Sequence, residues 1–189
     1  MTEEQLIHLL VQKDESAFRH LVTLYEGKVY ATVISFLRAD EYADDVAQEV
    51  FIKVHESIGD FRRESSLSTW IYRIAVTQSL AFLRKQKRKK RWGAMFSLFG
   101  EDNAPRFEEV SYHHPGLTLE NKEMGEALFK AIDQLPETQK TAFTLHKLKG
   151  LSYEEVSEVM NLTLSSVESL MHRANTNLRK YLFQYYKNL

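Results

Sequence analysis

The sequence predicts an all-α protein made of two small helical domains joined by a flexible linker, the second of them a helix-turn-helix domain. Only seven glycines and three prolines interrupt its 189 residues. Apolar residues recur at spacings of three and four, and no alternation at every second position persists as a strand would require. Because a spacing of three and four gathers side chains on one face of a helix, we expect helices everywhere outside the linker.

The composition excludes several classes of protein. With 43% hydrophobic residues the chain can bury real cores and is not disordered. Its net charge of −1 creates no overall field that attracts nucleic acid, so any such binding must come from local clusters of cations. There is no cysteine for a disulfide or a thiolate metal site, and no apolar run approaches the ~20 residues that span a bilayer. We expect a cytoplasmic protein without a signal peptide or membrane insertion.

The first predicted domain covers residues 1–92. It begins with a short helix over Glu3–Gln12, followed by a second helix for which Asp14 is the expected N-cap. Gly27 is expected to end or bend that second helix before Val29–Leu37 continues it.

A third helix is predicted over Glu41–Ile58, and it has two distinct faces. The face expected to turn inward carries Val46, Ala47, Val50, Phe51, Val54 and Ile58. The opposite face carries Asp45, Gln48, Glu49, Ile52 and Lys53. An apolar Ile52 among acids and an amide indicates a protein-binding face. The alternative is an ordinary surface helix with one exposed apolar residue, since isolated surface apolar residues are common.

Gly59–Glu64 is predicted to be a loop that leads into one long helix, Ser65–Arg91, with Ser65 or Ser66 as its N-cap. The helix is aromatic and apolar at its start, with Trp70 and Tyr72, and seven of its last eight residues are cations. Cations neutralise phosphates, while aromatic rings and hydroxyls engage bases, so the helix is a candidate nucleic-acid contact. The alternative is a buried helix with a solvated basic tail.

The second predicted domain, residues 118–189, follows a linker over residues 93–117 that is rich in glycine, proline and acidic residues. Helices are expected over Glu120–Gln134 and Glu137–Lys149. Pro136 is expected at the first helical position of the latter, and Gly150 at its C-terminal cap.

A helix-turn-helix closes this domain. Ser152–Glu155 reads as a capping box that opens one helix, and Asn161–Thr163 is a tight turn with Thr163 as the cap of a last helix, Leu164 to about Tyr186. One side of the last helix is apolar. Its other side is short and polar at the N-terminal end and cationic further on, as a recognition helix would be: Ser165, Ser169, His172, Arg173, Thr176 and Lys180.

Five segments in order resemble those of bacterial sigma-70-type factors: DDVAQEVFIKV, STWIYRIA, LRKQKRKKR, LPETQKTAF and LSYEEVSEVMNLTLSSVESLMHRA. The short two-domain layout resembles the extracytoplasmic-function (ECF) subgroup. The resemblance covers about residues 14–182 apart from the linker. It implies an initiation subunit that binds core RNA polymerase, through its β′ clamp and β flap, and promoter DNA. It also implies regulation by an anti-sigma factor.

The resemblance also assigns residues to these partners. The polymerase clamp would meet Asp45, Gln48, Glu49, Ile52 and Lys53. The −10 element would be bound and opened by Phe61, Arg62, Arg63, Ser65, Ser66, Ser68, Thr69, Trp70, Tyr72, Arg73, Thr77, Arg84, Lys85, Lys87 and Arg88. The −35 element would be bound as duplex by Ser165, Ser166, Glu168, Ser169, His172 and Arg173.

Four positions depart from the family's usual pattern. Thr77 stands where Asn is frequent and Ala81 where Asp is common. Glu168 replaces a commonly basic residue, and Leu170 an arginine. Glu168 can accept a hydrogen bond from cytosine N4 but repels phosphate. These changes bear on promoter preference rather than on the general role.

Three alternatives compete with this interpretation. An enzyme would need a site such as a hard-metal cluster of Asp44, Asp45 and Glu49, but Lys53 lies nearby and no glycine-rich phosphate loop or nucleophile elbow appears. We therefore expect neither an enzyme nor a cofactor, metal or small-molecule substrate. A helix-turn-helix regulator that acts without polymerase would account for residues 120–186 only.

A sigma-like protein that binds polymerase but has lost promoter opening is the last alternative, and Thr77 and Ala81 keep it open.

Overall fold

A computed structural model describes residues 1–38, 40–97 and 119–187, and the chain divides into two compact units, Met1–Val110 (unit 1) and Ser111–Leu189 (unit 2). The described residues form helices, turns and loops, with no strand among them, which confirms the all-α prediction. No described helix is both long and apolar enough to cross a membrane.

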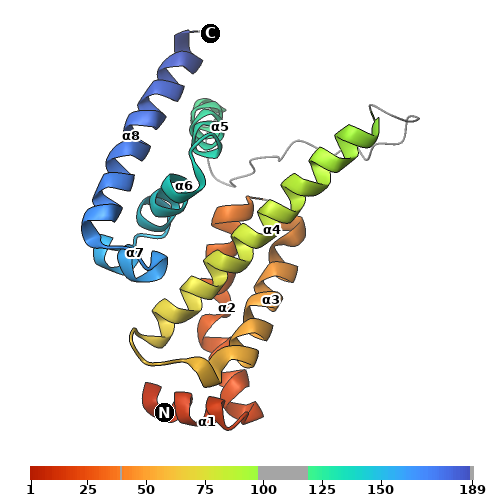
Figure 1. Cartoon of the computed structure of the whole chain (residues 1–189), viewed down its shortest axis with the longest axis vertical. Helices are drawn as coiled ribbons and strands as arrows, with labels where there is room; N and C mark the ends of the chain where they lie inside the picture. Colours follow the sequence, from red (N-terminus) through yellow and green to blue (C-terminus); the bar gives the residue numbers. More distant parts are fainter. Residues whose placement is uncertain (39, 98–118, 188–189) are drawn as a thin grey trace. The chain divides into compact units, whose positions relative to one another are not determined.

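Unit 1 is a bundle of three long helices with a short helix at one end (Figure 1). Its helices are α1 (Glu3–Val11), α2 (Glu15–Leu37), α3 (Ala43–Ser57) and α4 (Leu67–Ser97), with 3₁₀ turns at Asp40–Tyr42 and Ile58–Asp60. The α2, α3 and α4 helices contact one another, and α1 packs on α2 and on the second 3₁₀ turn. The interior is fully apolar at Leu21, Val33, Phe36, Val50, Val54, Ile58, Leu67 and Ile71, each at most 1% exposed.

The caps of the first two helices follow from their sequences. Thr2 and Gln5 form a capping box at the start of α1, and the Asp14 carboxylate accepts the Ala17 N–H at 2.7 Å. The α2 helix does not end at Gly27, because it is continuous from Glu15 to Leu37. A glycine inside a helix costs only about 1 kcal/mol relative to alanine, and burial of the α2 residues on both sides of it outweighs that cost.

The predicted bounds of two helices also need correction. Glu41 lies in a 3₁₀ turn, and α3 begins at Ala43. The α4 helix continues beyond Arg91, through Gly93, to Ser97 and so enters the segment assigned to the linker. A single glycine does not end the helix here, because the residues before it are good helix formers.

Unit 2 consists of α5 (Leu119–Asp133), α6 (Glu137–Phe143), a π-helical turn (Thr144–Leu148), α7 (Tyr153–Met160) and α8 (Leu164–Lys187). The long α8 helix packs against α5, α6 and α7. The core between them includes Ile132, Leu145, Val156, Val167, Met171 and Ala174, each at most 1% exposed.

The local signals in unit 2 are largely confirmed. Ser152 and Glu155 form the predicted capping box, and Gly150 has a φ of +72°, which favours glycine. Two details differ. Pro136 is the N-cap of α6 rather than its first helical residue, and the helix predicted over Glu137–Lys149 widens into the π turn after Phe143.

Candidate polymerase and nucleic-acid interfaces

The outer face of α3 is built as the sequence predicts. Asp45, Gln48, Glu49, Ile52 and Lys53 are all exposed, while Val46, Ala47, Val50 and Val54 on the other face are buried. Phe51, expected to point inward, is only half-buried. Ile52 is 51% exposed, and the neighbouring Lys53 ammonium lies 3.2 Å from the Glu56 carboxylate. The α3 face therefore combines one apolar centre with a charged rim.

The loop before α4 ends in a serine cap. The Thr69 N–H donates to Ser66 Oγ at 3.1 Å, and the hydroxyls of Ser66 and Thr69 lie 2.9 Å apart. Thr69 is only 9% exposed. Ser66 and Thr69, both expected to bind the −10 element, are thus engaged with each other at the start of the helix. Ser65 and Ser68 are half-buried, and Arg62 and Arg63 are exposed.

An aromatic pair joins the loop to the helix. The rings of Phe61 and Trp70 have centroids 5.1 Å apart with an interplanar angle of 44°, and both side chains are half-buried. This tilted contact fixes the loop against the first turns of α4. It also leaves aromatic surface beside the exposed arginines of the loop.

The middle of α4 presents a mixed surface. Tyr72 and Arg73 are half-buried, while Thr77 and Ala81 are exposed. The Thr77 hydroxyl donates to the Arg73 carbonyl at 2.7 Å, so it is turned back on its own helix. Two of the departures from the family pattern thus lie on an accessible face.

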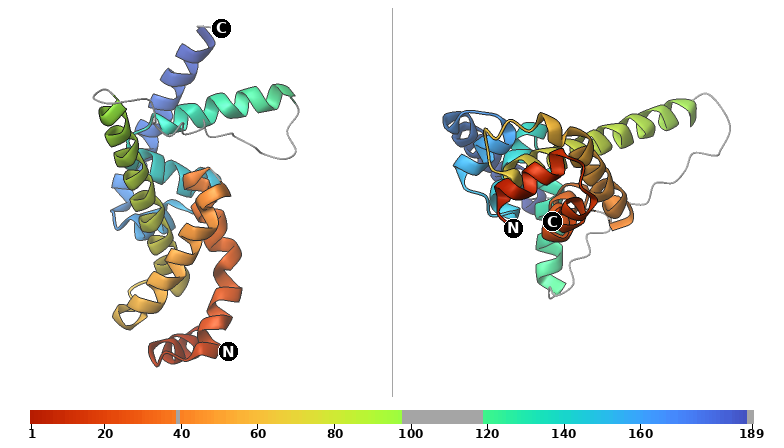
Figure 2. Two further views of the ribbon diagram at one scale, coloured as in Figure 1. Left: turned by 90° about the vertical axis from the view of Figure 1, so that its right-hand side faces the viewer. Right: turned by 90° about the horizontal axis from the view of Figure 1, so that it is seen from below.

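The cationic end of α4 extends past α2 and α3 (Figure 2). Arg84, Lys85, Lys87 and Arg88 are exposed there, as expected for side chains that neutralise phosphates. The side chains of Lys90 and Arg91 lie outside the described residues. Within the described part of unit 1, this is the densest run of exposed cations along one helix.

The helix-turn-helix of unit 2 is α7, a turn at Asn161 with a left-handed φ of 53°, and α8. Thr163 caps α8 by accepting the Ser166 N–H at 3.2 Å, as predicted. The apolar side of α8 is buried at Val167, Leu170, Met171, Ala174 and Leu178. The polar side is exposed at Ser165, Glu168, Ser169, His172 and Arg173, and Ser166 is half-buried.

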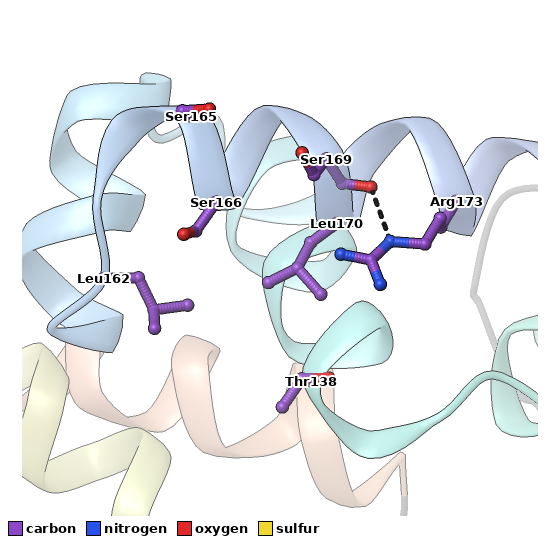
Figure 3. Close-up of a pocket in the computed structure, with 7 residues that line it drawn as sticks. All are labelled: Thr138, Leu162, Ser165, Ser166, Ser169, Leu170 and Arg173. Carbon is purple, nitrogen blue, oxygen red and sulfur yellow. Dashed lines mark hydrogen bonds between the residues drawn. The ribbon is translucent and has the colours of Figure 1, made fainter.

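A pocket lies beside the first turns of α8 (Figure 3). Thr138 of α6 and Leu162 of the turn line it together with Ser165, Ser166, Ser169, Leu170 and Arg173. The Arg173 Nε donates to the Ser169 carbonyl at 3.1 Å, which holds the guanidinium along the helix. Glu168, Ser169, His172 and Arg173 line a second, adjoining hollow.

The sequence did not single out Thr138 and Leu162 as parts of this surface. Leu162, in the turn just before α8, is 39% exposed. Thr138 lies in the first turn of α6, and the packing of α6 on α8 brings it to the pocket. Leu170 is only 9% exposed and lines the pocket wall, so an arginine at that position would have to leave a largely buried site.

The metal alternative finds no geometric basis. Among the described residues, which include Asp44, Asp45 and Glu49, no three His, Asp or Glu side chains gather closely enough to hold a metal ion.

Comparisons with known proteins agree on one group. Residues 21–89 match the family described as sigma-70 region 2, and residues 125–178 match sigma-70, region 4. The chain is 35% identical to an ECF RNA polymerase sigma-E factor of Haemophilus influenzae, over 92% of each chain. It is 32% identical to the ECF RNA polymerase sigma-E factor of Escherichia coli, over 92% of this chain and 91% of the relative.

The fold is likewise similar to solved structures. CnrH, in a complex with the cytosolic domain of CnrY, is 19% identical, with a TM-score of 0.64 over 96% of this chain and 97% of that chain. The sigma factor RpoE of Bartonella quintana, in a complex with the anti-sigma factor NepR, is 21% identical, with a TM-score of 0.59 over 87% of this chain and 96% of that chain.

Proposed function

The chain belongs to the sigma-70 family, as an RNA polymerase sigma factor of the ECF group, and from that premise we propose how its two units share the work of promoter recognition. Unit 1 binds core polymerase and opens the −10 element, and unit 2 binds the −35 element as duplex. The main support for this assignment comes from α8 in the capped helix-turn-helix of unit 2. Its polar side is exposed, while its apolar side is buried in the unit.

The region-2 role is assigned to residues 1–92, the linker to 93–117 and the region-4 role to 118–189. Core polymerase contacts the α3 face through its β′ clamp, with Ile52 at the centre of the contact and Asp45, Gln48, Glu49 and Lys53 around it. An apolar centre within a polar rim is the usual anatomy of a protein–protein interface. The β flap contacts unit 2.

The −10 element meets the loop and the start of α4. A base extruded from the duplex lies beside the Phe61–Trp70 pair, and Arg62 and Arg63 neutralise the neighbouring phosphates. Extrusion of the base costs a few kcal/mol of free energy, and stacking of the base on an aromatic ring offsets about 1–3 kcal/mol of that cost. Ser66 and Thr69 act mainly through the helix cap, because their hydroxyls are engaged with each other. No nucleotide hydrolysis is needed for this exchange, so we assign no enzymatic activity.

Further along α4, Tyr72 and Arg73 support strand separation, and Arg84, Lys85, Lys87 and Arg88 hold the backbone. Thr77 lies on the exposed face between these groups, so it is placed to affect which −10 sequence is preferred. Thr77→Asn is expected to change that preference and leave polymerase binding unchanged.

The −35 element meets the first turns of α8. Ser165, Ser169 and His172 face the base edges, and Arg173 lies where it reaches either a base or a phosphate. Glu168 selects cytosine on one strand by accepting from N4, because a carboxylate repels the phosphates but complements that donor.

Regulation and location follow from the same assignment. An anti-sigma factor is expected to hold the protein inactive, as NepR binds RpoE of Bartonella quintana. The protein acts in the cytoplasm, where promoter DNA and polymerase are found, and needs no cofactor.

Site-specific photo-crosslinking tests the assignment of unit 1 to the −10 element and of unit 2 to the −35 element. A photoreactive amino acid replaces Tyr72, His172 or, as a control in α5, Lys130, and each full chain is assembled with core polymerase on fragments that the holoenzyme selects from genomic DNA. We expect position 72 to cross-link near −10 and position 172 near −35, with position 130 at background. Selection of the same fragments by the chain without polymerase would instead support a stand-alone regulator.

A further inference from the structure

The N-terminal helix reaches the start of α4, far away in the sequence. The Leu67 N–H, at the first position of α4, donates to Glu3 Oε1 at 3.4 Å across 64 residues. The first N–H groups of a helix have no partner within it, and Ser66 Oγ already accepts the Thr69 N–H. Two of the open N–H donors in the first turn of α4 are therefore satisfied by side chains: that of Thr69 by the local Ser66 and that of Leu67 by the distant Glu3.

Several contacts hold Glu3 at this position. The Thr2 capping box defines the first turn of α1, with the Thr2 N–H donating to Gln5 Oε1 at 3.0 Å. Leu6, Ile7 and Leu10 are each at most 4% exposed, and α1 packs on the 3₁₀ turn Ile58–Asp60 that leads into the loop. The carboxylate is thus held by a helix that packs on α2 and on the turn just before the loop.

The negative charge of Glu3 also acts on one neighbouring phenol, that of Tyr25. The pKa of Tyr25, on α2, is raised first by burial of its phenol and then by the negative charge of Glu3 and by Tyr72. Glu3 of α1 and Tyr72 of α4 thus both act on the same Tyr25 ring. A carboxylate at a helix N-terminus is also favourable, because the helix dipole is positive there.

We infer that Glu3 is a positioning residue for promoter opening: it fixes the first turn of α4, and with it the Phe61–Ser66 loop that receives the extruded base. The inference rests on the proposed function of unit 1. We assign Glu3 itself no contact with DNA. Its effect is on the geometry of the loop and on the opening step, and not on polymerase binding or on unit 2.

Promoter opening by the reconstituted holoenzyme tests this role. Glu3→Ala removes the acceptor, Glu3→Gln keeps an acceptor oxygen without the charge, and Glu4→Ala removes the adjacent exposed carboxylate of the same helix turn. Permanganate reactivity of unpaired thymines is measured on a double-stranded promoter and on the same promoter with the −10 region already unpaired. Core binding and the melting temperature of each variant are measured in parallel.

We expect Glu3→Ala to slow opening of the double-stranded promoter by about three- to tenfold, the range for loss of one hydrogen bond. The variant should act like wild type on the unpaired promoter, Glu3→Gln should recover most of the rate, and Glu4→Ala should match wild type. Equal rates for Glu3→Ala and Glu4→Ala would overturn the inference, and so would an equal loss on both promoters or in core binding. A wild-type protein that opens no promoter would instead contradict the proposed function itself.

Discussion

Replacement of Ile52 by alanine is expected to weaken binding of core polymerase without weakening the fold. Ile52 is 51% exposed on α3, and its neighbours on that face are charged or amide side chains. Surface substitutions of this kind usually change the free energy of unfolding by no more than about 0.5 kcal/mol. Any larger loss of function must therefore come from a partner that covers the side chain.

The size of the loss follows from the exposed fraction. Full burial of an isoleucine side chain contributes about 1.5–3 kcal/mol, and about half of that surface is still open in the free protein. A partner that covers the remainder gains about 0.8–1.5 kcal/mol, which corresponds to a change in Kd of about four- to thirteenfold. A charged substitution such as Ile52→Asp should cost more, because it places an unpaired charge in the contact.

Leu24→Ala is a matched control for this measurement. Leu24 is 50% exposed and lies in α2, in the same unit but away from the α3 face. Each full-length variant competes with fluorescently labelled wild type for purified core polymerase, and thermal unfolding is followed separately. Ile52→Ala should compete more weakly, and Leu24→Ala should compete like wild type. Equal Kd values for the two variants would refute the assignment of the α3 face to polymerase.

Three further predictions concern caps, pH and DNA. Ser66→Ala should destabilise unit 1 by about 0.5–2 kcal/mol because it removes an N-cap, whereas Ser65→Ala should not. The melting temperatures of the two variants, compared with that of wild type, test this difference. A hydrogen bond from Ser16 lowers the pKa of the Asp14 carboxyl in the folded protein. The ionised carboxylate therefore stabilises the fold at pH values above its unfolded-state pKa. This stabilisation is lost as the pH falls through the folded-state pKa. The difference in unfolding midpoint between wild type and Asp14→Asn should therefore shrink on acidification. Arg173→Ala should weaken holoenzyme binding to the −35 duplex and reduce the salt dependence if the contact is to phosphate; Lys130→Ala should do neither.

Apolar spacing and capping residues, which depend only on neighbouring positions in the sequence, were sufficient to predict most of the helices. Apolar spacing predicted the buried side of α3 and the stripe from Val167 to Leu178, because burial of one face is what stabilises these helices. Side-chain caps were equally readable at Asp14 and Ser152, since each cap depends on residues only three positions apart. The predicted helix ends differ from the structure where low helix propensity competes with packing, as at Gly27 and at the end of α4.

The parts of the site that depend on distant contacts could not be read from the chain. Nothing local to Glu3 indicates that it accepts a hydrogen bond from Leu67, and nothing near Thr138 places it beside Leu162. The contact between the hydroxyls of Thr69 and Ser66 in the cap was equally invisible in the sequence, although both residues were assigned to the −10 element. In each case the decisive partner is fixed by folding of the chain rather than by a sequence pattern.

Transcription from a fragment library with purified core polymerase is the direct test that this chain is an initiation factor. The full chain is added to core polymerase, run-off transcripts are collected, and their 5′ ends are sequenced. We expect discrete start sites that are absent with core polymerase alone and that share two upstream elements at a constant spacing. Start sites no more frequent than those of core polymerase alone would contradict it.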